Sequence, residues 1–354
     1  MAKVVIGVHG LGNKPSKDIL SCWWRKAIDE GLRYAQSPRL LYKFDLVYWA
    51  NHLYTEPLDP AETDLNSLQF IREVYLPNNI FKKEEPPAWW RKTLDYVEKQ
   101  LDKMFLNKDM TINFSSISDY ILKRYFRDLS IYYEINQSPE DSPFLGAKKR
   151  IRQELASILE SYKGNEIMLI AHSMGSIVAY DVLIHLTPHI EIDTFVTLGS
   201  PLGLPVIISK IFEEQKKALP FLEVRTPENI TRHWYNLSDL DDRVAINYNL
   251  NDDYEANSRQ IKPVDYIVQN NYEIGGISNP HKSFGYLRTP QMAKIFHEFL
   301  DQGRSKTALW VSEKANHFFC NYIEESANSI PELAKRFAGN VKENILDGGK
   351  KSKQ

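Results

Sequence analysis

The most constraining feature of the sequence is an apolar run that breaks into a turn of small residues and then into a helical pattern. Residues 166–171 read EIMLIA, which predicts a β-strand buried on both faces. The turn HSMGS follows, and residues 175–186 have the apolar character of a buried helix. A strand that passes directly into a helix is the repeating unit of parallel α/β sheets. We therefore expect the chain to fold around such a sheet.

The same alternation continues along the chain. Short β-branched apolar runs predict strands, and amphipathic patterns between them predict helices. The fold class is thus α/β, with a mostly parallel central sheet flanked by helices. The predicted strands are 3–8, 45–49, 166–171, 193–198, 232–237 and 264–268, and the predicted helices are 17–34, 147–162, 175–186 and 291–300.

One stretch interrupts this alternation. Residues 55–143 separate the second and third predicted strands, where a crossover needs only about a dozen residues. Apolar residues recur at helical spacing within it, first at positions 65, 68, 71 and 75, and Pro and charge clusters separate the segments. The stretch predicts a helical cap, or lid, inserted into a core formed by 1–54 and 144–302. Residues 303–354 are expected to form a C-terminal helical extension with a disordered tail.

Composition limits the classes of partner. Lys and Arg number 44 against 46 Asp and Glu, and the formal net charge of −2 gives no basis for a nucleic-acid partner. No run of about 18 apolar residues occurs, so no integral membrane association is expected. The N-terminus shows no signal-peptide pattern, and two cysteines are too few for a disulfide framework. These features favour a reducing, cytoplasmic location.

The turn HSMGS predicts a nucleophile. A serine at a sharp strand-to-helix turn projects its hydroxyl at the carboxyl edge of the sheet. The next backbone N–H and the helix dipole then face any developing oxyanion. The turn is cramped and needs small neighbours: Gly175 follows Ser173 by two residues, and Ala171 stands where G-x-S-x-G has its first glycine. Ser173 is therefore the candidate nucleophile, and His172 beside it is expected to line the site.

These motifs resemble those of the α/β-hydrolase superfamily, specifically its lipase- and esterase-like members, from the first strand to about residue 300. In that family a His-Gly pair follows an early strand, and the next residue donates its N–H to the oxyanion hole. The run VVIGVHGLGNKP matches with His9 and Gly10, so the resemblance implies that Leu11 and Met174 are the two donors. Gly10 and Gly12 would allow close approach of the substrate, and His9 is expected to pack behind the loop.

A serine nucleophile needs an imidazole base, which a carboxylate orients. The family order of Ser, then Asp or Glu, then His restricts the base to histidines after Ser173. His281 lies in the loop GGISNPHKSFGYL, and catalytic residues are common in loops on rigid scaffolds. The histidines at 185, 189, 233, 297 and 317 lie too early, on predicted strands or helices, or beyond the family pattern. His281 is therefore the candidate base.

The acid is expected after the strand 232–237, in SDLDDRVAI. Asp239, Asp241 and Asp242 all qualify by position. Family members often have an Asp-x-Val step at this turn, which Asp242 and Val244 reproduce, so the resemblance favours Asp242. The other two aspartates stay open, as does a purely turn-capping role for the cluster. The run LGSPLG at residues 198–203 also resembles a lipase turn and implies that Ser200 lies near the floor of the site.

The resemblance implies hydrolysis of a carboxylic ester, or a thioester, through an acyl-enzyme intermediate, with no cofactor and no metal. A helical cap rich in aromatic residues favours a partly apolar small-molecule substrate. Amidases, peptidases and acyltransferases of the same fold share this machinery and stay open. A non-catalytic binding module built on the same fold is the alternative from another class.

Overall fold

The computed structural model describes residues 2–35, 42–78, 128–129, 131–133, 144–218, 223–245 and 247–301. The chain divides into two compact units. The first consists of Met1–Gly12, Tyr42–Thr55 and Lys83–Gln269, and the second of Asn13–Leu41, Glu56–Lys82 and Asn270–Gln354. In the described part of the chain, no helix is both long enough and apolar enough to cross a bilayer.

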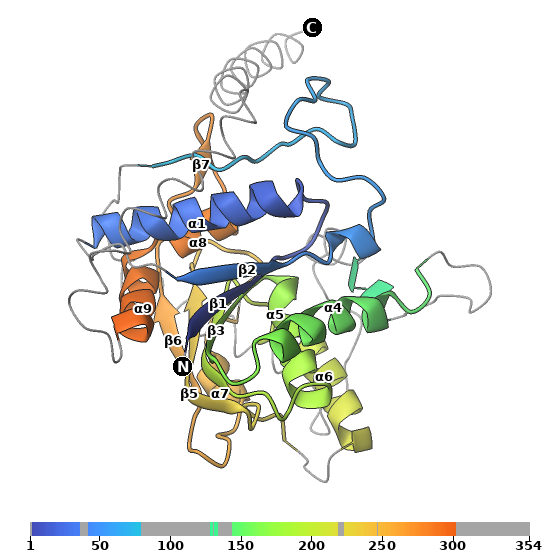
Figure 1. Cartoon of the computed structure of the whole chain (residues 1–354), viewed down its shortest axis with the longest axis vertical. Coiled ribbons are helices and arrows are strands. Elements are labelled where there is room, and N and C mark those ends of the chain that lie inside the picture. The colour runs from blue at the N-terminus through green and yellow to red at the C-terminus, as the bar shows by residue number, and fades with distance from the viewer. Residues whose placement is uncertain are drawn as a thin grey trace, which may run out of the picture. The chain divides into compact units, whose positions relative to one another are not determined.

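The first unit is built on a six-stranded parallel sheet in the order β2-β1-β3-β4-β5-β6 (Figure 1). β1 and β4 are buried at every position, as expected for central strands of a parallel sheet. All six predicted strands are confirmed, with small differences at their ends. They are β1 (Lys3–Val8), β2 (Lys43–Val47), β3 (Glu166–His172), β4 (Ile192–Leu198), β5 (Ile230–Ser238) and β6 (Pro263–Ile267).

Helices of the same unit bury their apolar residues with the sheet in one continuous core. α4 (Ala147–Ser161) buries a single stripe that includes Ile151, Leu155 and Leu159, as its amphipathic pattern predicts. α5 (Met174–His185) is buried on nearly all sides, which explains why its sequence is apolar without a stripe. α6 (Pro205–Ala218) joins the same core, and the short η1 (Ala50–His52) and α7 (Leu250–Asp253) complete the unit.

The second unit contains α1 (Lys17–Tyr34), which packs against α8 (Ser283–Leu287) and α9 (Pro290–Asp301) (Figure 1). A small antiparallel hairpin of β7 (Glu273–Ile274) and β8 (Ile277–Ser278) precedes α8. The predictions of helices at 17–34 and 291–300 are confirmed. Close packing requires glycine on α1, because a Cβ atom at Gly31 would lie 2.8 Å from the Cα atom of Arg288.

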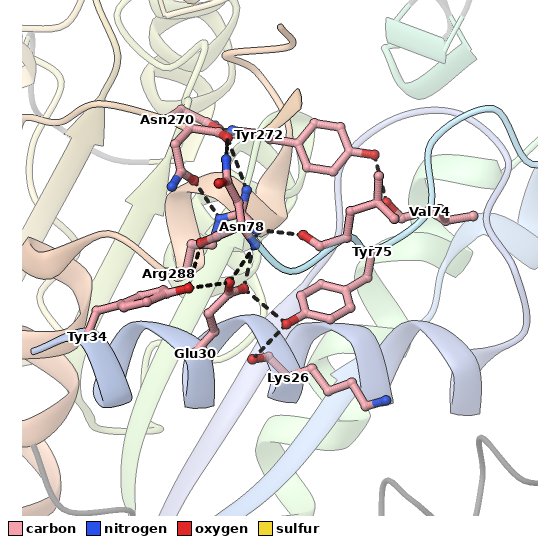
Figure 2. Close-up of polar contacts among 11 residues, drawn as sticks. Lys26, Glu30, Tyr34, Val74, Tyr75, Asn78, Asn270, Tyr272 and Arg288 are labelled. Atoms are coloured by element: carbon pink, nitrogen blue, oxygen red, sulfur yellow. Dashed lines mark hydrogen bonds and ion pairs between the residues drawn. The ribbon is translucent and has the colours of Figure 1, made fainter. Parts of the chain in front are cut away.

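A buried ion pair joins α1 to the segment after α8 within the second unit (Figure 2). Glu30 on α1 and Arg288 after α8 are both 0% exposed, with 3.3 Å between Oε2 and Nη1. Two buried charges are tolerable only when their other donors and acceptors are also bonded. Glu30 accepts from the hydroxyls of Tyr34 and Tyr75 and the N–H of Asn78, and Arg288 donates to Leu76 and twice to Asn271. Burial, and then the charge of Glu30, raise the pKa of Tyr75 and keep its hydroxyl a donor.

The start of the insertion is not helical, so the prediction of a helix through positions 65–75 is wrong. Residues 56–78 form turns and extended chain. The Asp59 carboxylate accepts the N–H of Ala61, and the Asp64 carboxylate accepts the N–H of Asn66. Such local side-chain bonds compete with helix formation. Leu68, one of the apolar positions in the pattern, is 91% exposed.

The remainder of the predicted cap is described only at residues 128–129 and 131–133, of which 128, 129, 131 and 132 are helical. Its other residues, and the predicted extension at 303–354, lie outside the described residues. The boundaries of the predicted cap and core therefore stay predictions.

Candidate active site

Ser173 lies between the last residue of β3 and the first residue of α5, in a sharp turn. Its φ is 55° and its ψ is −133°, a region that residues other than glycine rarely occupy. Its N–H donates to the carbonyl oxygen of Leu198 on β4, at 3.0 Å. Its own carbonyl oxygen accepts both the N–H (2.9 Å) and the hydroxyl (2.6 Å) of Ser176. The strained conformation is thus held from the neighbouring strand and from the following helix.

The loop after β1 and the turn after β3 touch through glycines. A Cβ atom at Gly10 would lie 2.7 Å from the Cβ atom of Ser173 and 2.9 Å from Nδ1 of His172. A Cβ atom at Gly175 would lie 2.6 Å from the carbonyl oxygen of His9. Contacts this short do not occur between real Cβ atoms and their neighbours, so glycine is needed at both positions. The structure therefore brings Gly10, His172 and Ser173 together.

The two proposed oxyanion donors lie at the ends of these turns. Met174 is the first residue of α5, where a backbone N–H has no acceptor within the helix. Leu11 packs on the core beside Gly12, whose φ is 80°. The N–H of Gly12 donates to the carboxylate of Asp128 at 3.2 Å, and the Tyr54 hydroxyl donates to the same carboxylate. Asp128 is a residue that the sequence motifs did not reveal, because it belongs to the insertion and to no recognisable pattern.

His9 is fixed by bonds to both of its ring nitrogens. Nδ1 donates to the carbonyl oxygen of Gly10 at 2.8 Å, because a carbonyl can only accept. Nε2 must then accept the N–H of Trp49, at 3.1 Å. The ring also stacks on Trp49, with 4.6 Å between centroids. This neutral, fully engaged imidazole holds the loop that carries Leu11 and has no nitrogen left to act as a base.

Ser200 is linked to the Ser173 turn through Ser176. Its Oγ is 2.7 Å from Oγ of Ser176, and it accepts the N–H of Leu202 at 3.2 Å. Ser176 in turn bonds to the carbonyl oxygen of Ser173. Ser200 therefore supports the backbone of the turn through Ser176, a second residue that the sequence motifs did not single out.

The candidate acids follow β5, two strands from β3 in the sheet. The carboxyl ends of parallel strands meet at one edge, so this turn and the Ser173 turn lie at the same edge. Asp242 and Asp239 are buried, at 2% and 6% exposure, whereas Asp241 is exposed. The Asp242 carboxylate accepts the N–H of Val244, and the Asp239 carboxylate accepts that of Asp241. Burial favours Asp242 and Asp239 as orienting acids over Asp241.

His281 belongs to the second unit, in the turn that leads into α8. It is half-buried, and its N–H donates to Oδ1 of Asn279 at 3.1 Å. His297 lies in the same unit, on α9.

The later histidines of the first unit have other surroundings. Burial lowers the pKa of His185, against the opposing charge of Asp181. His189 is exposed and pairs with Glu160, and His233 is exposed on β5 and stacks on Tyr235.

One group of side chains in the described residues has the spacing of metal ligands: Asp181, His185 and Glu214. Arg152 bonds to both carboxylates, and Lys148 pairs with Glu214, so two cations already balance the two negative charges. Asp181 lies eight residues into α5 from Ser173, about 12 Å along the helix. This cluster is therefore separate from the turn that carries the serine.

Comparison with known proteins finds a family match within the first unit. Residues 146–258 match the family described as the PGAP1-like alpha/beta domain, and the match spans the Ser173 turn and the aspartates after β5. An α/β domain over these residues agrees with β3, α5, β4 and β5 of the parallel sheet, and together they support an α/β-hydrolase fold for the first unit. A solved structure described as a cell surface hydrolase from Lactobacillus plantarum WCFS1 is 12% identical, with a TM-score of 0.25 over 64% of this chain and 93% of that chain. No curated protein matches the chain.

We expect Gly10→Ala to disturb the Ser173 turn more than the fold. The added methyl must push Ser173 or His172 aside, and overpacking of this kind costs about 1–3 kcal/mol. The free energy of unfolding should fall by that amount, while any hydrolytic turnover that depends on Ser173 should fall at least tenfold because the hydroxyl is displaced. Urea denaturation and steady-state kinetics on the same preparation measure the two effects. Wild-type turnover in the variant would contradict the close approach of the two turns.

Proposed function

We propose that the chain is a serine hydrolase that cleaves a carboxylic ester through an acyl-enzyme intermediate. The observation that supports this most strongly is the conformation of Ser173, a non-glycine residue with a φ of 55° between a buried parallel strand and a buried helix. Strained backbone of this kind is concentrated at functional sites. In α/β-hydrolases this is the position of the nucleophile.

In the proposed reaction, Oγ of Ser173 attacks the ester carbonyl carbon while His281 accepts the hydroxyl proton. The backbone N–H groups of Leu11 and Met174 stabilise the oxyanion of the tetrahedral intermediate. The intermediate collapses, the alcohol leaves with the proton from His281, and the acyl group stays on Ser173. Water then attacks the acyl-enzyme with His281 again as the base, which releases the acid and restores the serine.

Asp242 is our proposal for the carboxylate that orients His281. Its burial and its place at the carboxyl end of β5 support this role, and the Asp-x-Val step supports it over Asp239. His281 itself is assigned from the chain order of the superfamily, in which the histidine follows the acid. Neither step needs a cofactor or a metal.

The proposed substrate is a small, partly apolar ester. The insertion between β2 and α4 supplies many aromatic residues. Aromatic and apolar side chains line most small-molecule sites, with a few polar groups that fix the orientation of the ligand.

We expect Ser173→Ala to lower kcat for short p-nitrophenyl esters by roughly 10³-fold or more, because the covalent route is lost. The matched control is Ser209→Ala, which removes a buried hydroxyl from α6 and should keep wild-type turnover. Circular dichroism of both variants checks the fold. Equal turnover in wild type and Ser173→Ala would overturn the proposed chemistry, and no turnover in the wild type would favour a binding module.

A panel of Asp→Asn changes at 239, 241 and 242 distinguishes which of the three aspartates after β5 is the orienting acid. Asparagine keeps the shape but loses the charge that stabilises the imidazolium, so the change at the true acid should cost up to about 10⁴-fold in kcat. We expect the greatest loss at Asp242 and the smallest at the exposed Asp241. The kcat of each variant is measured on one ester, and near wild-type turnover in Asp242→Asn would remove Asp242 from the mechanism.

A further inference from the structure

Residues 73–78 of the insertion belong to the second unit and are here called the strap. Its backbone and side chains bond to three other parts of that unit (Figure 2). The carbonyl oxygen of Val74 accepts the Tyr272 hydroxyl at 2.7 Å, and that of Leu76 accepts Nη1 of Arg288 at 2.7 Å. The N–H of Asn78 donates to Glu30 at 2.7 Å. The buried Glu30–Arg288 pair therefore fixes the path of the strap.

The first residue of the strap reaches the turn that carries His281. One carboxylate oxygen of Glu73 accepts the side-chain amide of Asn279, and the other pairs with Nζ of Lys282 at 2.9 Å. Asn279 and Lys282 flank His281 on either side. A single carboxylate thus binds both ends of a four-residue turn whose N–H at Lys282 donates to the carbonyl oxygen of Asn279.

Glu73 also decides which way the amide of Asn279 points. A carboxylate can only accept hydrogen bonds, so it must face the NH₂ group of the amide and not its oxygen. The oxygen is then directed to the N–H of His281, at 3.1 Å. With the carboxylate removed, both orientations of the amide become available, and in one of them an NH₂ group would face the N–H of His281. The backbone of the histidine would lose its acceptor.

We propose that Glu73 is a positioning residue for His281 and acts through Asn279. This inference rests on the proposed role of His281 as the base of the serine hydrolase. It gives the strap a part in catalysis: the strap fixes the orientation of one amide, and that amide fixes the backbone of the base. Because the Glu73–Lys282 pair is partly exposed, its own contribution to stability is small, and its main effect is on geometry.

The test compares kcat and KM for p-nitrophenyl butyrate in full-length wild type, Glu73→Ala and Glu73→Gln. We expect Glu73→Ala to lower kcat about 10- to 100-fold with KM within about twofold, since small misplacements of a catalytic group have effects of this size. Glu73→Gln keeps one acceptor for Asn279 and should recover most of the loss. The matched control is Glu298→Ala, which removes the carboxylate of an exposed ion pair on α9 and should leave kcat unchanged.

A double-variant cycle separates positioning from a general loss of stability. In an Asn279→Ala background, Glu73→Ala should change kcat by less than about twofold, because its route to His281 is already gone. Multiplicative losses in the double variant, or a Glu73→Ala kcat within twofold of wild type, would overturn the inference. If Glu73→Ala does not fold, Glu73→Leu, which keeps the bulk of the side chain but removes both acceptors, carries the same cycle. If turnover by the wild type does not depend on Ser173, the proposed function is overturned, and the inference falls with it.

Discussion

The backbone conformation of Ser173 is the constraint on which the first unit depends. A φ of 55° at a non-glycine residue costs on the order of 1–3 kcal/mol, and it persists only where the surroundings enforce it. Here β4 accepts the N–H, Ser176 binds the carbonyl, and glycines at 10 and 175 let the β1 loop approach closely. The central strands and α5 therefore support the turn that places the Ser173 hydroxyl at the carboxyl edge of the sheet.

Local sequence patterns were sufficient to predict the sheet and two of the helices that share its core, α4 and α5, but not α6. A strand such as β3 is a continuous apolar run because both of its faces are buried, and this signal does not depend on distant residues. The prediction failed at positions 65–75, where apolar spacing suggested a helix. There, Asp59 and Asp64 bond to nearby N–H groups, and the side chain of Leu68 is exposed. Apolar spacing shows which residues could share one face of a helix, but it does not show whether those side chains become buried.

The sequence predicts those residues of the candidate site that lie in continuous motifs. The Ser173 turn and the glycines after β1 belong to this class. Asp128 and Glu73 do not, because each acts on a residue far along the chain: Asp128 on Gly12, 116 positions away, and Glu73 on Asn279, 206 positions away. Both come from the insertion, so the insertion contributes to the two loops that would hold the oxyanion and the base. Contacts of this range arise from the folded topology and leave no local signal.

The central claim is that the hydroxyl of Ser173 is an activated nucleophile, and covalent labelling tests it most directly. The native protein is treated with a fluorophosphonate, digested, and analysed by mass spectrometry to locate the adduct. The account predicts a single adduct on Ser173, and none when the protein is unfolded in denaturant before treatment, because the activation depends on the folded turn and its base. An unlabelled native protein, or an adduct confined to a different residue, would contradict it.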